Sequence, residues 1–169
     1  MKRILITGMS GTGKTTVTKL LQARGFEAVD TDSGEWCEWA ALPGEAQAGW
    51  LWREEKMHGF LALPRSGPLF VNGCVSNQGR FYPQFDQVVL FSAPPSVILE
   101  RVRTRTNNPY GKTAAEQREI LDYITTAQPL LRRGADVEIN TAALSAEAIA
   151  DQLVALAQRP SSHQGATPI

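Results

Sequence analysis

The chain has 169 residues, which suits a single domain, and its 17 lysines and arginines balance its 17 aspartates and glutamates. Zero net charge argues against a nucleic-acid partner, because such proteins normally carry a basic excess. The two cysteines lie far apart without zinc-ligand spacing, and no apolar run reaches the length of a membrane span or of a signal-peptide core. We therefore expect a soluble protein of the cytoplasm.

The start of the chain carries its most specific motif. An apolar strand at 3–7 runs into GMSGTGKT at 8–15, which matches G-x-x-x-x-G-K-[ST], and a helical stretch follows at 16–24. Glycines let the backbone turn its N–H groups inward, and the start of the helix adds unpaired donors and the positive end of its dipole. A strand, loop and helix in this order predict binding of nucleotide phosphates rather than a chance glycine-rich turn.

Two side chains of this loop have specific expected roles. Lys14 supplies a mobile positive charge for the β- and γ-phosphates, and the hydroxyl of Thr15 is placed to ligate Mg²⁺. The expected nucleotide contacts in this segment are Gly8, Ser10, Gly11, Thr12, Gly13, Lys14, Thr15 and Thr16.

Further along the chain, apolar strands alternate with helices. The predicted strands lie at 27–29, 69–72, 87–91 and 137–139, and the predicted helices at 96–105, 113–128 and 145–158. Ser96 is the expected cap of the first helix, Thr113 opens the second with a capping box, and Pro129 breaks or kinks it. The alternation predicts an α/β fold, a parallel sheet with helices on both faces, in one domain over 1–158. We expect a disordered tail at 159–169.

Two carboxylates follow the second predicted strand, at the sheet edge where open α/β sheets bind ligands. Asp30 and Asp32 could hold Mg²⁺ through water and accept a hydrogen bond or a proton from an acceptor hydroxyl; alternatively, Asp32 caps the following turn. Asn72, at the end of the third strand, stands where ATP-hydrolysing motors carry an acid. Because an amide is a poorer Mg²⁺ ligand than a carboxylate, we expect Asp30 to hold the metal. The segment after Ile139 belongs to the same edge.

A basic segment after the fourth strand has the composition of a lid. Arg101 and Arg105 are four residues apart and so share a face of the predicted helix, and NNPYG at 107–111 interrupts the helical pattern. A loop at about 105–113 flanked by cations suits closure over a transferred phosphate. We expect Arg105 to contact the phosphates or the adenine, with Arg101 as a second nucleotide contact. The alternative is a solvated basic helix face.

The segment at about 33–66 is the expected acceptor-binding region. It contains all four tryptophans of the chain, between positions 36 and 52. They could form aromatic walls around an acceptor bound by Arg53, fill the core of a helical subdomain, or serve as a partner interface. Arg80, which follows the third strand, could face the acceptor from the other side or be a surface arginine.

In order and spacing of these motifs, residues 1–157 resemble the small P-loop kinases of the nucleoside-monophosphate-kinase and shikimate-kinase type. The resemblance implies a P-loop NTP hydrolase fold with a five-stranded parallel sheet in the order 2-3-1-4-5, an acceptor region between strands two and three, and a mobile lid. It also implies that Asp30 helps to hold Mg²⁺ and that Asp32 and Arg53 contact the acceptor.

The chain departs from that family at positions that bear on the acceptor. The family's glycine triplet after the third strand is reduced to Asn72-Gly73-Cys74, and Ala127 stands where the family has an arginine. Loss of a carboxylate-binding arginine predicts an acceptor other than shikimate. The D-G-F-P-R signature of adenylate kinases is also missing, so AMP is not predicted either.

The expected function is transfer of the γ-phosphoryl group of Mg-ATP to a small-molecule acceptor, a nucleotide or a hydroxyl metabolite. The expected catalytic residues are Lys14, Asp32 and Arg105, the metal ligands Thr15 and Asp30, and the acceptor contacts Asp32, Arg53, Gly73 and Arg80. ATP and Mg²⁺ are the expected cofactors, with neither a nucleic acid nor a membrane as partner. The alternative is an ATP-binding regulatory module or a slow NTPase without a small-molecule acceptor. ATP or GTP preference and the oligomeric state stay open.

Overall fold

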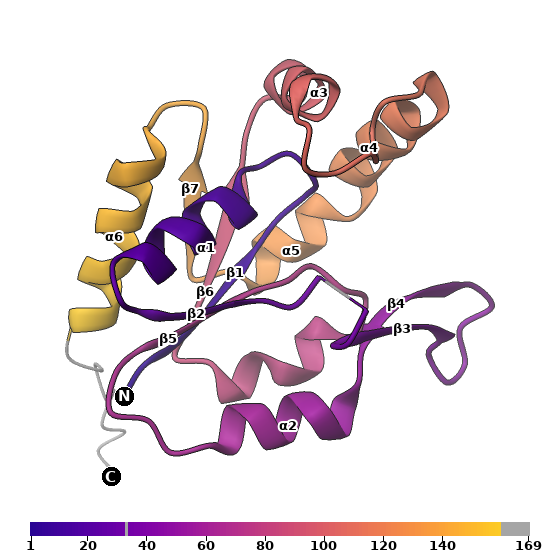
Figure 1. Cartoon of the computed structure of the whole chain (residues 1–169). Coiled ribbons are helices and arrows are strands. Elements are labelled where there is room, and N and C mark those ends of the chain that lie inside the picture. The colour runs from indigo at the N-terminus through magenta and orange to yellow at the C-terminus, as the bar shows by residue number, and fades with distance from the viewer. Residues whose placement is uncertain (33, 160–169) are drawn as a thin grey trace, which may run out of the picture.

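A five-stranded parallel sheet forms the centre of the molecule, with the strands in the order β2-β5-β1-β6-β7 (Figure 1). Counted along the chain, these strands have the order 2-3-1-4-5, so the predicted fold is confirmed. The computed structural model describes residues 1–32 and 34–159, so the predicted tail lies, apart from Arg159, outside the described residues. The strands are β1 (Arg3–Thr7), β2 (Glu27–Asp30), β5 (Leu69–Asn72), β6 (Gln87–Ser92) and β7 (Val137–Asn140).

Helices cover both faces of this sheet, as the continuous apolar runs in its three inner strands β1, β5 and β6 require. Side chains alternate along β1, so Ile4 and Ile6 pack with α1 and α6 while Leu5 packs with α2 and η1 on the opposite face. These helices are α1 (Lys14–Ala23), α2 (Glu54–Ala62), the 3₁₀ helix η1 (Gln78–Gln84) and α6 (Ala146–Gln158). Among the described residues, no helix is long and apolar enough to cross a membrane.

A group of three helices follows β6: α3 (Pro95–Thr104), α4 (Ala114–Thr126) and α5 (Gln128–Gly134). The N-cap of α3 is Pro94, so the prediction that Ser96 caps this helix is wrong. Pro95 suits the first turn because proline has no N–H group and the N–H groups of a first turn have no partner within the helix. The capping box at Thr113 is confirmed, and Pro129 lies in the first turn of the separate helix α5. Because α3 ends at Thr104, Arg105 has an extended backbone and does not share a helix face with Arg101.

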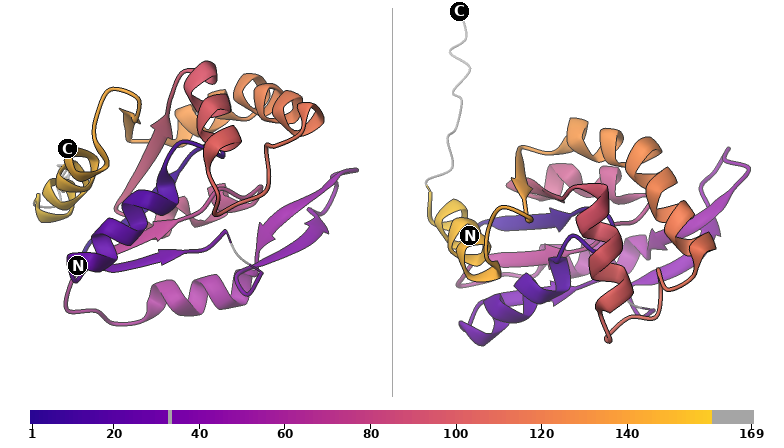
Figure 2. Two further views of the ribbon diagram at one scale, coloured as in Figure 1. Left: turned by 45° about the horizontal axis from the view of Figure 1, so that its top comes forward. Right: turned by 90° about the horizontal axis from the view of Figure 1, so that it is seen from above.

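The segment between β2 and α2 forms a β-hairpin, so the prediction of a helical subdomain is wrong, although Trp36 and Trp52 are buried in a core cluster with residues of α2. Its strands are β3 (Cys37–Ala41) and β4 (Ala48–Trp52), which pair antiparallel with Trp39 opposite Trp50. Gly44 in the connecting loop has a φ of 87°, which glycine adopts at low cost. The hairpin projects beyond the carboxyl ends of β2 and β5 (Figure 2).

Candidate active site

The phosphate loop follows β1, and packing requires two of its glycines. Gly8 and Gly11 have φ values of 142° and 85°. A Cβ on Gly8 would lie 2.3 Å from the carbonyl oxygen of Phe91, and a Cβ on Gly11 would lie 2.9 Å from Cγ1 of Val102. The loop can therefore lie against β6 and α3 only with glycine at both positions.

Helix α1 begins directly after the loop. Its N-cap is Gly13, and no side chain of the described residues caps it, so the N–H groups of its first turn are available to an anion. The positive end of the helix dipole points the same way. This arrangement suits a bound phosphate group.

The side chain of Lys14 folds back along the loop. Its Nζ donates a 2.7 Å hydrogen bond to the carbonyl oxygen of Gly8 and lies 3.7 Å from Oδ2 of Asp32. The Lys14 side chain is 9% exposed and that of Asp32 is 39% exposed. A mostly buried cation thus lies beside a carboxylate that is accessible to solvent.

Asp30 and Asp32 are held in place by a chain of hydrogen bonds at the ends of the strands. Asp30 Oδ2 accepts a 2.8 Å bond from the Thr15 hydroxyl, and Asp30 Oδ1 accepts a 3.1 Å bond from the amide of Asp32. Asp32 Oδ1 in turn accepts a 2.8 Å bond from the amide of Cys74. The two predicted metal-site residues, Thr15 and Asp30, are therefore in direct contact.

Asn72 lies next to Asp30 in the sheet register and is fully buried. Neither Oδ1 nor Nδ2 of its amide has a hydrogen-bond partner among the described residues. Since Phe70 of the same strand packs with α1, alternation puts Asn72 on the α1 side as well. The hydroxyl of Thr15, the carboxylate of Asp30 and this amide oxygen are hard donors that fit Mg²⁺, an ion that keeps much of its water and needs few protein ligands.

Two arginines reach the phosphate loop from the opposite side. Arg101 donates 2.9 Å bonds to both the hydroxyl and the carbonyl oxygen of Thr141, and a 3.4 Å bond to the carbonyl oxygen of Gly11. Arg105 donates from Nη2 to the Ser10 hydroxyl at 3.1 Å and to the carbonyl oxygen of Tyr110 at 2.7 Å. Burial lowers the pKa of the Arg105 guanidinium below its ordinary value.

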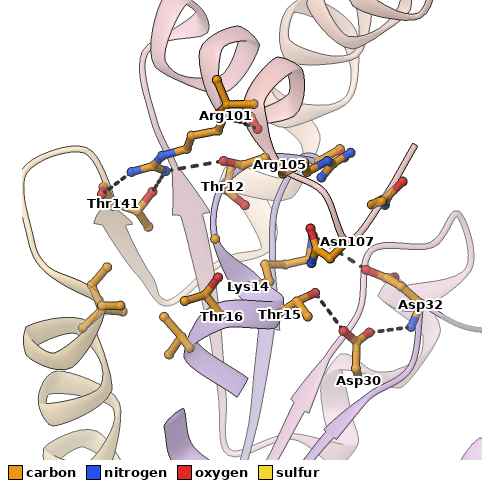
Figure 3. Close-up of a pocket in the computed structure, with 18 of the residues that line it drawn as sticks. Thr12, Lys14, Thr15, Thr16, Asp30, Asp32, Arg101, Arg105, Asn107 and Thr141 are labelled. Carbon is orange, nitrogen blue, oxygen red and sulfur yellow. Dashed lines mark hydrogen bonds and ion pairs between the residues drawn. The ribbon is translucent and has the colours of Figure 1, made fainter. Parts of the chain in front are cut away.

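These groups surround one cavity of about 650 Å³ (Figure 3). Arg101 and Arg105 lie above the phosphate loop, whereas Asp30 and Asp32 lie at the other end of the cavity, beyond Lys14 and Thr15. The predicted lid loop adds Asn107 and Asn108 to the polar lining. The volume is in the range of small-molecule sites.

The far wall of the cavity contains residues that we did not name from the sequence. They are Thr141, Leu144, Ala146 and Ile149, in the turn after β7 and the start of α6. The sequence places the segment after Ile139 at this edge, but which side chains face the loop depends on how α6 packs beside α1.

Of the predicted acceptor contacts, Asp32 lines this cavity, whereas Arg53, Gly73 and Arg80 lie outside its lining. Arg53 pairs with Glu38 at 3.3 Å, and Arg80 pairs with Glu54 at 2.5 Å. A Cβ on Gly73 would lie 2.6 Å from both the Thr31 hydroxyl and Cζ2 of Trp52, so packing requires glycine there.

The profile of the AAA domain family matches residues 4–122, which is more than half of the chain. The chain belongs to the AAA domain family. Two relatives are the shikimate kinases of Thermodesulfovibrio yellowstonii and Halorhodospira halophila. The first is 29% identical over 167 residues, covering 91% of this chain and 94% of that protein. The second is 29% identical over 171 residues, covering 94% and 96%.

The fold agrees with that of a solved shikimate kinase structure. Shikimate kinase from Bacteroides thetaiotaomicron superposes with a TM-score of 0.63 at 22% identity, covering 92% of this chain and 97% of that chain. This AAA domain protein is a small P-loop kinase of the nucleoside-monophosphate-kinase and shikimate-kinase group, which confirms the resemblance seen in the sequence. It is therefore an enzyme of the phosphotransferase class that acts on small molecules.

Proposed function

We propose that the protein transfers the γ-phosphoryl group of ATP to a small-molecule acceptor in the presence of Mg²⁺. The observation that carries this proposal is the 3.7 Å approach of Lys14 Nζ to Asp32 Oδ2 beside the phosphate loop. A phosphotransferase needs a cation for the moving phosphoryl group and a carboxylate for the attacking hydroxyl, next to each other.

The transfer step follows from this placement. The acceptor oxygen attacks the γ-phosphorus, the bond to the β–γ bridging oxygen breaks, ADP leaves with that oxygen, and the hydroxyl proton passes to Asp32. Lys14 would leave its contact with the Gly8 carbonyl oxygen to stabilise the charge on the phosphoryl oxygens. Thr15 and Asp30 would hold Mg²⁺, which neutralises phosphate charge when bound.

Arg105 would complete the site from the loop at 105–113. Its guanidinium already joins the phosphate loop, at Ser10, to this loop, at Tyr110. Since Asn107 and Asn108 line the same cavity, closure of this loop over ATP would exclude water from the transferred group.

The alternative function is that of an ATP-binding regulatory module or slow NTPase. Asn72 favours it, because an amide replaces the acid that ATP-hydrolysing proteins carry at the end of this strand. Binding of ATP without turnover on any acceptor would support this alternative.

Release of ADP from Mg-ATP tests the proposal, over a panel of nucleosides, nucleoside monophosphates, sugar acids and small alcohols. We expect one acceptor class to raise ADP release saturably in the wild type. Lys14→Ala should abolish this increase, whereas Lys19→Ala, an exposed lysine on the same helix, should keep it. Acceptor-dependent ADP release that survives in Lys14→Ala would contradict the assignment.

A further inference from the structure

One face of the β3–β4 hairpin packs against the strand end that carries Asp32. Trp52 Nε1 donates a 3.0 Å hydrogen bond to the Thr31 hydroxyl, and the Cys37 thiol donates a 3.0 Å bond to the Thr31 carbonyl oxygen. Cys37 and Trp52 are opposite each other in the hairpin and both are buried. This face therefore begins one residue from the carboxylate expected to meet the acceptor.

The same face continues outward as an exposed aromatic surface. Side chains two residues apart on a strand point the same way, so Trp39 and Trp50 extend the face formed by Cys37 and Trp52. Their rings meet edge to face with centroids 5.4 Å apart, and they are 61% and 54% exposed. They lie two residues, or about 7 Å, further out along the strands than Cys37 and Trp52. We call Trp39 and Trp50 the aromatic pair.

The cations around this surface are already bound by carboxylates of the same region. Arg53 pairs with Glu38 at 3.3 Å, and Arg80 pairs with Glu54 at 2.5 Å. Lys56, further along α2, pairs with Glu35 at 3.1 Å. Residues 34–63 contain five glutamates against one arginine and one lysine, so the region is net negative.

This charge pattern disfavours an anionic acceptor. Phosphate and carboxylate groups are recognised by arginines that are free to form two hydrogen bonds with them. Here Arg53 and Arg80 each donate from one nitrogen to a glutamate that offsets their charge, and an anion would also meet the excess negative charge of the region. An acceptor without negative charge meets neither obstacle.

We propose that the acceptor is an alcohol without negative charge that carries a flat ring, and that the aromatic pair binds this ring while Asp32 receives the hydroxyl. The inference rests on the proposed phosphotransfer and specifies its acceptor class. Exposed indole rings provide apolar surface and a stacking face for such a ring, at low cost in conformational entropy.

Matched compounds that differ in one anionic group test the inference. We would measure the affinity of the Mg-ADP complex for adenosine against AMP, uridine against UMP, and benzyl alcohol against 4-(hydroxymethyl)benzoate. Calorimetry gives the dissociation constant, and ADP release from Mg-ATP reports turnover. Because the chain has four tryptophans, quenching of their fluorescence reports on the aromatic pair only where it is lost in Trp39→Thr or Trp50→Thr. We expect at least one uncharged member to bind about tenfold or more tightly than its anionic partner.

Variants separate the two parts of the inference. Trp39→Thr and Trp50→Thr should each weaken binding of the uncharged member about tenfold, whereas Trp39→Phe, which keeps a ring, should restore most of it. The double variant Glu38→Gln, Glu54→Gln should free the charges of Arg53 and Arg80. We therefore expect a smaller ratio between the affinities for the uncharged compound and for its anionic partner. Glu27→Gln breaks the Arg65–Glu27 pair at the opposite end of β2 and should leave the preference unchanged.

Tighter binding of the anionic members by the wild type, lost in Arg53→Gln, would overturn the inference. Turnover of an acceptor that has no ring, without binding of any ring compound, would overturn it and leave the proposed function intact. If Lys14-dependent ADP release is absent with every acceptor tested, the proposed function fails and the inference fails with it.

Discussion

The Thr15 hydroxyl donates a 2.8 Å hydrogen bond to Oδ2 of Asp30, which joins the first turn of α1 to the end of β2. The two groups belong to different elements, yet both are oxygen donors of the kind that Mg²⁺ prefers. The fully buried amide of Asn72 lies beside Asp30 on the neighbouring strand. We infer that α1, β2 and β5 together position the metal end of the site.

Replacing Asp30 should raise the Mg²⁺ requirement more than it changes nucleotide binding. Asp30→Asn keeps an oxygen for the Thr15 hydroxyl but removes the charge, so we expect half-maximal activity at roughly tenfold higher Mg²⁺. A Mg²⁺ titration of ADP release measures this shift. Asp122→Asn, on the exposed side of α4, serves as the control, and equal Mg²⁺ curves for the two variants would contradict the assignment.

Arg105 should not tolerate replacement by lysine. Its Nη2 donates to both the Ser10 hydroxyl and the Tyr110 carbonyl oxygen, and the ammonium of a lysine, one bond shorter, would not reach both acceptors. We expect Arg105→Lys to lower kcat roughly tenfold or more, since it would move the charge that we propose to face the transferred group.

Arg103→Lys is the matched control for this experiment. Arg103 lies two residues before Arg105, in the last turn of α3, but its guanidinium bonds to the Gln117 side chain. Steady-state kinetics at saturating ATP should show a kcat close to that of the wild type. A similar loss in both variants would mean that Arg105 acts through the stability of α3.

The phosphate-loop end of the site could be predicted because its determinants are local. The strand, loop and helix are consecutive, and Asp30 follows from the rule that carboxyl ends of parallel strands share one edge. The contacts of Arg101 with Thr141 and of Arg105 with Ser10 join residues 40 and 95 positions apart. Such contacts depend on how α3 packs over the loop, which no local pattern encodes.

The tryptophan segment was hard to assign from the sequence because its tryptophans follow two different spacings. Trp36 and Trp39 are three residues apart, as on one face of a helix, whereas Trp50 and Trp52 are two apart, as on one face of a strand. The structure resolves the conflict by pairing Trp39 with Trp50 across the hairpin. This register depends on the loop that connects β3 and β4, so it cannot be read from the residue pattern of either strand alone.

Gly73→Ala should destabilise the protein. The added Cβ would lie 2.6 Å from Cζ2 of Trp52 and from the Thr31 hydroxyl, both in buried side chains, so we expect a loss of about 1–3 kcal/mol in the free energy of unfolding. In Gly59→Ala, the added Cβ meets nothing within 4 Å inside helix α2, and we expect a gain of about 0.5–1 kcal/mol. Urea unfolding measures the free energy of unfolding of both variants. If Gly73→Ala is as stable as the wild type, the side chains of Trp52 and Thr31 can move aside for the added Cβ at no cost.

Ionisation of Cys37 should weaken the fold at high pH. Burial raises the pKa of its thiol from an ordinary value of 9.0 to about 11, and the nearby Asp32 carboxylate adds to the rise. Because the folded state holds the proton more tightly than the unfolded state, this contribution to stability is complete below pH 9 and is lost as the pH rises towards 11.

The test compares the free energy of unfolding of the wild type and of Cys37→Ala between pH 8 and 11. Both proteins contain the same lysines and tyrosines, so the difference between their curves isolates the thiol. We expect the wild type to lose stability more steeply above pH 9, because its thiol must ionise in a buried site that also holds the bond to the Thr31 carbonyl oxygen. Parallel curves would show that Cys37 ionises with the same pKa in the folded and unfolded protein.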